Sequence, residues 1–90
     1  MMIKHIKITV KGRVQGVWFR AKTMEKALEL GVNGFVKNLI NGNVYIEAEG
    51  TDLQLQNFIS WCKIGPSLAN VNEVSEIKGS LVNFTLFEIK

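Results

Sequence analysis

The chain has one cysteine, one histidine and one proline among its 90 residues. A lone cysteine, Cys62, cannot form a disulfide within the chain, and the sequence has no paired Cys and His residues at zinc-site spacing. The N-terminus alternates isoleucine with lysine and histidine, so it lacks the unbroken apolar stretch of a signal peptide or a membrane-spanning helix. We therefore expect no metal, no export and no membrane insertion, and the reducing cytoplasm as the location.

Hydrophobic residues make up 47% of the chain, which suffices for one core, and the length predicts a single domain over residues 1–90. The net charge of +3 is unevenly distributed. Residues 1–37 hold eight Lys or Arg against two Glu (+6), and residues 38–90 hold three against six acidic residues (−3). The basic part favours an anionic partner, either a small phosphorylated metabolite or a nucleic acid, and charge does not choose between them.

The first thirty residues predict a strand, a loop and a helix. Apolar residues alternate with polar ones from Ile6 to Val10, the period of a strand with one buried face, so His5 is expected on the solvated face. Residues 12–19 contain two glycines and no sustained period, which is typical of an ordered loop. A helix is expected over residues 20–30, with an apolar stripe of Ala21, Met24, Ala27 and Leu28.

A hairpin and a second helix follow. Extended segments at residues 32–40 and 43–49 flank Asn41-Gly42, the dipeptide that best accepts the positive φ angles of a type I′ turn. Thr51 to Gln54 has the form of a capping box, in which the two side chains bind the first amides of a helix. The buried stripe of this helix has i, i+3, i+4, i+7 spacing and consists of Leu55, Phe58, Ile59 and Cys62.

Residues 71–78 and 82–89 predict two further strands. The order is then strand, helix, strand, strand, helix, strand, with a short extra strand at the C-terminus. This order predicts an α+β fold, the ferredoxin-like split βαβ sandwich, with both helices packed on one face of an antiparallel sheet.

The loop before the first helix is the first candidate binding segment. Successive amides in a tight loop with glycines can point inward as an anion nest, and the start of a helix adds free N–H groups and partial positive charge. Arg20 can then grip two phosphate oxygens with paired hydrogen bonds. The same residues also fit a plain strand-to-helix connection. No P-loop and no G-x-G-x-x-G motif is present, so we expect no nucleotide cofactor or other cofactor.

Asn38 is the second candidate. Asparagine is disfavoured in strands, and by period two Asn38 shares a face with Val36, so its amide is expected on a mostly apolar side. It can satisfy a loop carbonyl there, or hold a water molecule by donating and accepting at once.

Two long segments resemble the signature motifs of the acylphosphatase family. They are G-R-V-Q-G-V-W-F-R at residues 12–20 and G-F-V-K-N-L-I-N-G-N-V at residues 34–44, and the similarity extends over nearly the whole chain. The resemblance implies a ferredoxin-like fold with a five-stranded antiparallel sheet. It also implies hydrolysis of acyl phosphates to a carboxylate and inorganic phosphate without metal. Trp18 departs from the usual pattern, because glycine is frequent at its position in the family.

The family's residue roles carry over to matching positions of this chain. Arg20 is expected to bind the substrate phosphate, and Asn38 is expected to orient the attacking water on the other side of the same pocket. The amides of the loop are expected to complete the phosphate cradle, and these belong to Gln15, Gly16, Val17, Trp18 and Phe19. An acyl phosphate has a good leaving group, so positioning and charge stabilisation suffice without a catalytic His or Cys.

Two other functions remain open. An RNA-binding RRM-like module shares the element order and basic charge, but the first strand offers no aromatic residue for base stacking. A non-catalytic ligand-sensing domain of the same fold would use the loop for binding alone. We favour an enzyme that acts as a monomer on a small acyl phosphate, with no nucleic-acid or membrane partner.

Overall fold

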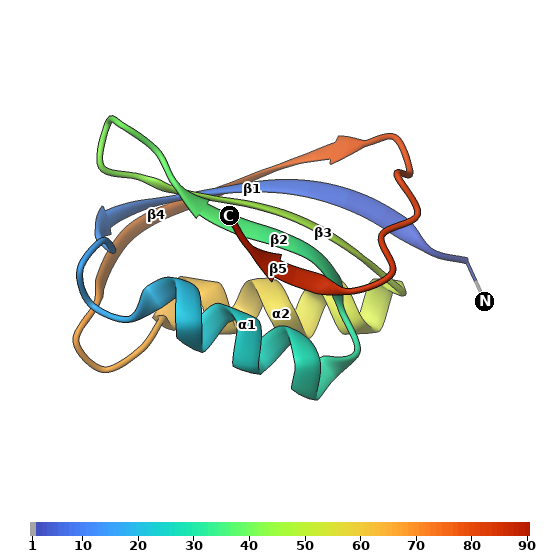
Figure 1. Cartoon of the computed structure of the whole chain (residues 1–90), viewed down its shortest axis with the longest axis horizontal. Helices are drawn as coiled ribbons and strands as arrows, with labels where there is room; N and C mark the ends of the chain where they lie inside the picture. Colours follow the sequence, from blue (N-terminus) through green and yellow to red (C-terminus); the bar gives the residue numbers. More distant parts are fainter. Residues whose placement is uncertain (1) are drawn as a thin grey trace.

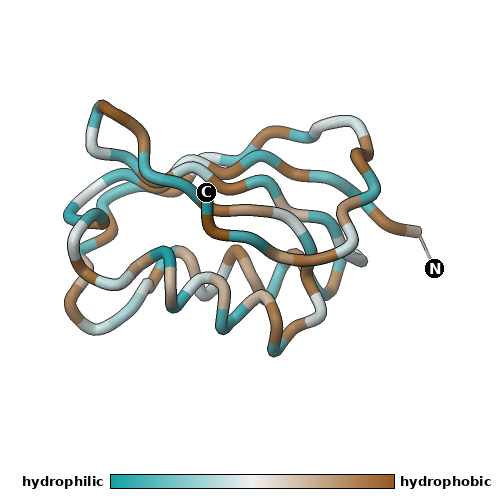
Figure 2. The backbone as a smooth tube through the Cα atoms, viewed as in Figure 1, coloured by the Kyte–Doolittle hydropathy of each residue, from teal (hydrophilic) through white to brown (hydrophobic). Residues whose placement is uncertain are grey.

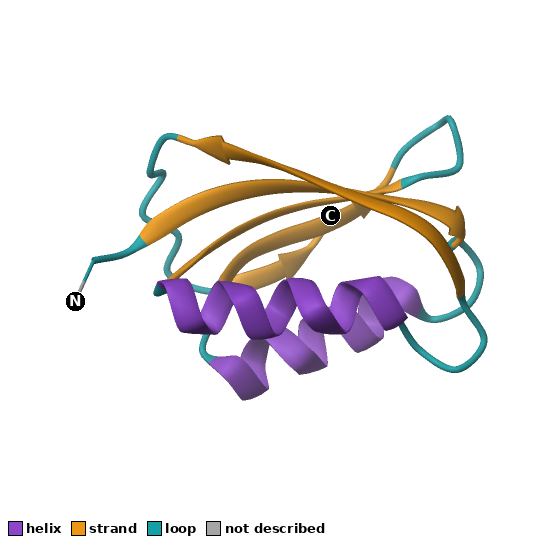
Figure 3. Cartoon of the chain, turned by 180° about the vertical axis from the view of Figure 1, so that it is seen from behind, coloured by secondary structure: helices purple, strands orange, loops and turns teal. Residues whose placement is uncertain are grey.

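The computed structural model describes residues 2–90. Its elements in chain order are β1 (Lys4–Arg13), α1 (Phe19–Leu30), β2 (Asn33–Asn38), β3 (Val44–Gly50), α2 (Asp52–Ile64), β4 (Asn70–Gly79) and β5 (Phe87–Ile89). The strands form one sheet in the order β4-β1-β3-β2-β5. Both helices cover the same face of this sheet (Figure 1, and from behind Figure 3). The predicted α+β, ferredoxin-like architecture is confirmed.

The sheet is mixed, so the prediction of a wholly antiparallel sheet is wrong in one pairing. β1 pairs antiparallel with β3 and β4, and β2 pairs antiparallel with β3, but β5 runs parallel to β2. Gly79, the last residue of β4, pairs with His5 of β1, and Asn33, the first residue of β2, pairs with Glu49 of β3. β4 therefore ends at the end of the sheet where β2 begins. The chain then crosses the sheet through residues 80–86 and returns along the far edge, which makes β5 parallel to β2. This crossing also shortens the last strand from the expected residues 82–89 to Phe87–Ile89.

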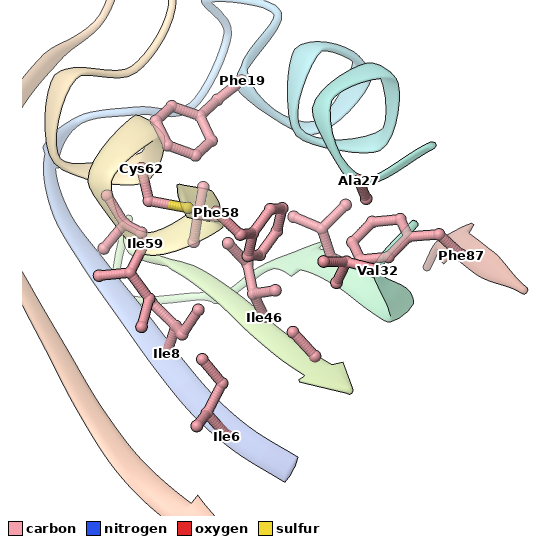
Figure 4. Close-up of a cluster of buried hydrophobic side chains, with 14 of the residues drawn as sticks. Ile6, Ile8, Phe19, Ala27, Val32, Ile46, Phe58, Ile59, Cys62 and Phe87 are labelled. Carbon is pink, nitrogen blue, oxygen red and sulfur yellow. The ribbon is translucent and has the colours of Figure 1, made fainter. Parts of the chain in front are cut away.

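The core lies between the sheet and the two helices. Figure 4 shows side chains from both helices and from the inner face of the sheet meeting in one cluster, with Phe58 beside Ile46 and Cys62 near Phe19. Along the strands, hydrophobic and hydrophilic residues alternate, as Figure 2 shows. On β1 the residues fully buried by this alternation include Ile8 and Val10. The predicted strand period is therefore confirmed.

The second helix agrees closely with its prediction. The Thr51 hydroxyl accepts a hydrogen bond from the Gln54 amide, and the Gln54 side chain accepts one from the Thr51 amide. The buried residues are those expected from the spacing: Leu55, Phe58, Ile59 and Cys62. Burial raises the pKa of the Cys62 thiol to about 12.

The first helix buries a different stripe from the predicted one. Its buried residues are Phe19, Thr23 and Ala27, while Leu28 is 63% exposed. Thr23 can be buried because its hydroxyl donates a hydrogen bond of 2.7 Å to the Phe19 carbonyl one turn earlier. A stripe predicted from apolar residues alone leaves out threonine. The buried position of Thr23 was missed for this reason.

Two local details also differ from expectation. β1 continues to Arg13 across a register shift between Lys11 and Gly12. A Cβ on Gly12 would meet the Asn70 carbonyl oxygen at 2.2 Å, so glycine is required for this close approach. The hairpin is confirmed, but positive φ falls on Gly42 and not on Asn41, so the turn is not type I′. The Gly42 amide instead donates to the Leu39 carbonyl and closes a β-turn.

The expectation of a solvated His5 is wrong. His5 is 3% exposed, on the sheet face opposite the helices, where Phe84 of the crossing segment stacks on its ring. His5 Nδ1 lies 2.7 Å from Glu49, and Nε2 lies at an ion-pair distance of 3.0 Å from Glu47 without a well-directed hydrogen bond. Period two placed His5 on the outer face correctly, but it did not reveal that Phe84, from the segment after β4, covers the His5 ring there.

Candidate active site

The loop between β1 and α1 is anchored by two valines. Val14 and Val17 are buried in the core. Gly16, which lies between them, and Trp18, which follows them, are exposed. Gly16 has φ 72° and Trp18 has φ 66°, so the backbone turns through the left-handed region twice within three residues. Such alternation lets consecutive amides converge on one side of a loop, which is the geometry of an anion-binding nest.

The start of α1 is open to an anion. Trp18 occupies the N-cap position, makes no side-chain cap and is followed by no acidic residue in the first turn. The first amides of a helix have no partner within the helix, and they carry the positive end of its dipole. The start of α2 is different, because Thr51 caps it and Asp52 lies in its first turn. Of the two helices, α1 is therefore the one that leaves amides for a ligand.

Arg20 lies at the second position of α1 and is exposed. Among residues 2–90, no carboxylate pairs with its guanidinium, whereas Lys22 and Lys26 each pair with a glutamate of α1. Arg20 lines a hollow of about 370 Å³ together with loop, helix and β5 residues: Val14, Gly16, Trp18, Phe19, Ala21 and Ile89. An unpaired guanidinium beside free amides can bind a phosphate by bidentate, charge-assisted hydrogen bonds.

Asn38 is the last residue of β2 and pairs with Val44 across the hairpin. Its Oδ1 is buried and accepts no hydrogen bond from any residue in the described part of the chain. A buried amide oxygen without a partner is uncommon in proteins and favours a role outside the fold's own hydrogen bonding. Asn38 lines a separate depression of about 510 Å³ with Lys37, Leu39, Ile40 and Asn41.

Gln15 connects these two regions by its side chain, which the sequence did not reveal. Its Nε2 donates to the carbonyl oxygens of Leu39 at 2.7 Å and Asn43 at 2.9 Å. The loop and the β2–β3 hairpin lie at the same end of the sheet (Figure 1). The only sequence signal was a glutamine within the first motif, and its partners are 24 and 28 residues away along the chain.

Comparison with known proteins identifies the family. A sequence model described as Acylphosphatase matches residues 6–89. The chain belongs to the acylphosphatase family. An acylphosphatase of Archaeoglobus fulgidus is 48% identical over 84 residues, which are 93% of this chain and 94% of the relative.

Solved acylphosphatase structures share the fold. The crystal structure of the Bacillus subtilis acylphosphatase aligns with a TM-score of 0.94 at 37% identity and covers 99% of both chains. The structure of a Coxiella burnetii acylphosphatase also aligns with a TM-score of 0.94, at 34% identity, and covers 98% of this chain and 93% of that one. The likeness therefore extends over the loop, both helices and all five strands.

The structure brings part of the predicted site together in one hollow. Gly16, Trp18, Phe19 and Arg20 line it, whereas Val17 points into the core and Gln15 toward the hairpin. The expectation that Asn38 and Arg20 line the same pocket does not match the hollows, because Asn38 lines a different depression. Ile89 of the hollow pairs with Val36, two residues before Asn38 on β2.

Two reactive residue types lie away from the candidate site. His5 is at the opposite end of β1 from the loop, and Cys62 is fully buried on the inner side of α2. No group of three His, Cys, Asp or Glu residues within residues 2–90 is arranged to hold a metal ion. None of the helices in this same range is long and apolar enough to span a membrane.

Proposed function

We propose that this chain hydrolyses the carboxyl–phosphate bond of acyl phosphates by the attack of water on a phosphate bound at the start of α1. One observation carries the proposal: Arg20, which pairs with no carboxylate of residues 2–90, shares a hollow with an uncapped helix start and a nest-like loop. The family to which the chain belongs gives the class of substrate.

Phosphate binding is assigned to the loop and to Arg20. The backbone amides of Gln15, Gly16, Val17, Trp18 and Phe19 donate to the phosphate oxygens, and the Arg20 guanidinium donates to two of them. These donors neutralise the charge that spreads over the equatorial oxygens as the bond to the leaving group lengthens.

Water positioning is assigned to Asn38. Its carboxamide, whose Oδ1 has no hydrogen-bond partner among residues 2–90, holds a water molecule by donating and accepting at once, so that the water oxygen faces the phosphorus of the bound phosphate. The water oxygen forms the new bond to phosphorus and the bond from phosphorus to the acyl oxygen breaks. The carboxylate leaves with the electron pair, and the water proton passes to the phosphate. The carboxylate is a good leaving group, so the reaction does not require a strong base.

The finer expectations about partners and location belong to the same proposal. A small acyl phosphate and inorganic phosphate are the proposed ligands, without a cofactor. The proposed state is a cytoplasmic monomer that binds no nucleic acid. The lack of stacking aromatics on β1 supports a metabolite over an RNA strand.

The proposed function is tested by mixing the purified protein with benzoyl phosphate in the presence of EDTA. We expect hydrolysis without added metal. Asn38→Ala is expected to lower kcat by roughly 10²- to 10³-fold while circular dichroism shows an unchanged fold. No turnover by the wild type, or turnover only with added metal, would reject the proposal. A wild-type rate for Asn38→Ala would remove Asn38 from it.

A further inference from the structure

We propose that Trp18 selects the organic part of the substrate: its indole forms the wall of an acyl subsite that favours aromatic acyl phosphates over acetyl phosphate. The inference rests on the proposed function and names the substrate class that the site prefers. It concerns the Trp18 side chain, whereas the phosphate cradle uses the backbone amide of the same residue.

The fold alone gives no reason for tryptophan at this position. Trp18 has φ 66° and ψ 16°, in the left-handed region that bulky residues rarely adopt and glycine adopts freely. Its side chain is 71% exposed, so it gains little from burial. Glycine would avoid both costs. A strained backbone carrying a large exposed side chain beside a binding site points to a role in binding.

The indole has no packing role that would explain it. Trp61 contacts the Phe19 ring at a centroid distance of 5.6 Å and is half buried, which is a structural use of tryptophan. Trp18 is in no aromatic pair and no cation–π contact among the rings of residues 2–90. Its face is therefore available to a ligand.

The hollow has the two halves that an acyl phosphate needs. Gly16 and Arg20 form its polar part, where the phosphate is proposed to bind. The remaining lining is apolar and comes from Val14, Trp18, Phe19, Ala21 and Ile89. An acyl group attached to a phosphate at Arg20 extends along this apolar part, because both parts belong to one hollow. An aromatic acyl group can then stack on the indole, whereas an acetyl group is too small to cover it.

The experiment compares kcat/KM for benzoyl phosphate and acetyl phosphate, both with EDTA, in the wild type and in variants. The ratio of the two values cancels any effect on the phosphate cradle, which is common to both substrates. Trp18→Gly suits the observed φ and is expected to fold. We expect it to lower the benzoyl-to-acetyl ratio about 3- to 10-fold, mainly through a higher KM for benzoyl phosphate.

Two further variants control the interpretation. Trp18→Phe keeps an aromatic face on the same strained backbone and is expected to stay within about twofold of the wild-type ratio. Leu28→Ala removes an exposed apolar side chain elsewhere on α1 and is expected to leave the ratio unchanged. A wild-type ratio in Trp18→Gly, or an equal loss in Trp18→Phe, would overturn the subsite while leaving acyl phosphate hydrolysis intact. A wild type that turns over neither substrate would overturn the proposed function and the subsite together.

Discussion

Gln15 Nε2 lies 2.7 Å from the carbonyl oxygen of Leu39, a hydrogen bond that joins the loop before α1 to the end of β2. A second bond of 2.9 Å from the same nitrogen reaches Asn43 on the other side of the hairpin. Leu39 directly follows Asn38. The side chain of Gln15 therefore holds the proposed phosphate loop and the proposed water-binding amide as one unit.

Gln15→Met should loosen this unit, because methionine has a similar length and no N–H donor. Loss of two part-buried hydrogen bonds is expected to lower the free energy of unfolding by about 1–3 kcal/mol. A small misplacement of Asn38 is expected to lower kcat about 10-fold or more. Urea unfolding and steady-state hydrolysis of benzoyl phosphate measure the two effects. Gln56→Met, at an exposed position of α2, is the matched control and should change neither. Wild-type kcat in Gln15→Met would show that the connection does not position the site.

Features set by neighbours in sequence could be predicted from the sequence. The capping box at Thr51 and Gln54 depends on residues three positions apart, and the stripe of α2 depends on spacing within one helix. Both predictions are confirmed in detail. Arg20 and Asn38 became candidates from their place before a helix and within a strand, and two long family motifs then gave them roles. The family is confirmed, and the two roles stay predictions.

Features set by distant partners could not be predicted. The burial of His5 depends on Phe84, and the role of the Gln15 side chain depends on Leu39 and Asn43. The left-handed φ of Trp18 is also hidden, because tryptophan gives no signal for a conformation that glycine usually occupies. In each case the local sequence pattern fits more than one structure. Packing against residues elsewhere in the chain determines which structure forms.

Glu49 should make the protein sensitive to acid. Burial by itself raises the pKa of Glu49, but hydrogen bonds from Val82, His5 and Phe84 outweigh it and hold the pKa below its ordinary value of 4.5. The unfolded chain therefore takes up a proton at Glu49 before the folded protein does. The resulting stability is fully present above the ordinary pKa and is lost as the pH falls from there through the folded pKa.

Thermal unfolding measured from pH 7 to pH 3 tests this acid sensitivity. We expect Tm to fall as the pH drops below about 5, and Glu49→Gln to have a lower Tm at pH 7 and a shallower acid dependence. Glu73→Gln, at an exposed position of β4, should follow the wild-type curve. Parallel curves for Glu49→Gln and the wild type would contradict the assignment.

Cys62 should be unreactive while the protein is folded. Its side chain is fully buried and its pKa is raised to about 12, so the thiolate is scarce at neutral pH and shielded from reagents. We expect an aromatic disulfide reagent at pH 8 to label the native protein far more slowly than the protein in denaturant. Equal labelling rates in both states would show that the core around α2 opens readily.

Arg20 is proposed to bind the phosphate that water attacks, and steady-state hydrolysis of benzoyl phosphate by Arg20→Ala measures how much of the rate depends on it. Arg20→Lys, assayed beside it, separates charge from the paired hydrogen bonds of a guanidinium. With EDTA present and folding checked by circular dichroism, we expect Arg20→Ala to lose roughly 10³-fold or more in kcat/KM and Arg20→Lys to recover only a small part. A folded Arg20→Ala that hydrolyses benzoyl phosphate at the wild-type rate would show that Arg20 does not bind the phosphate that is attacked.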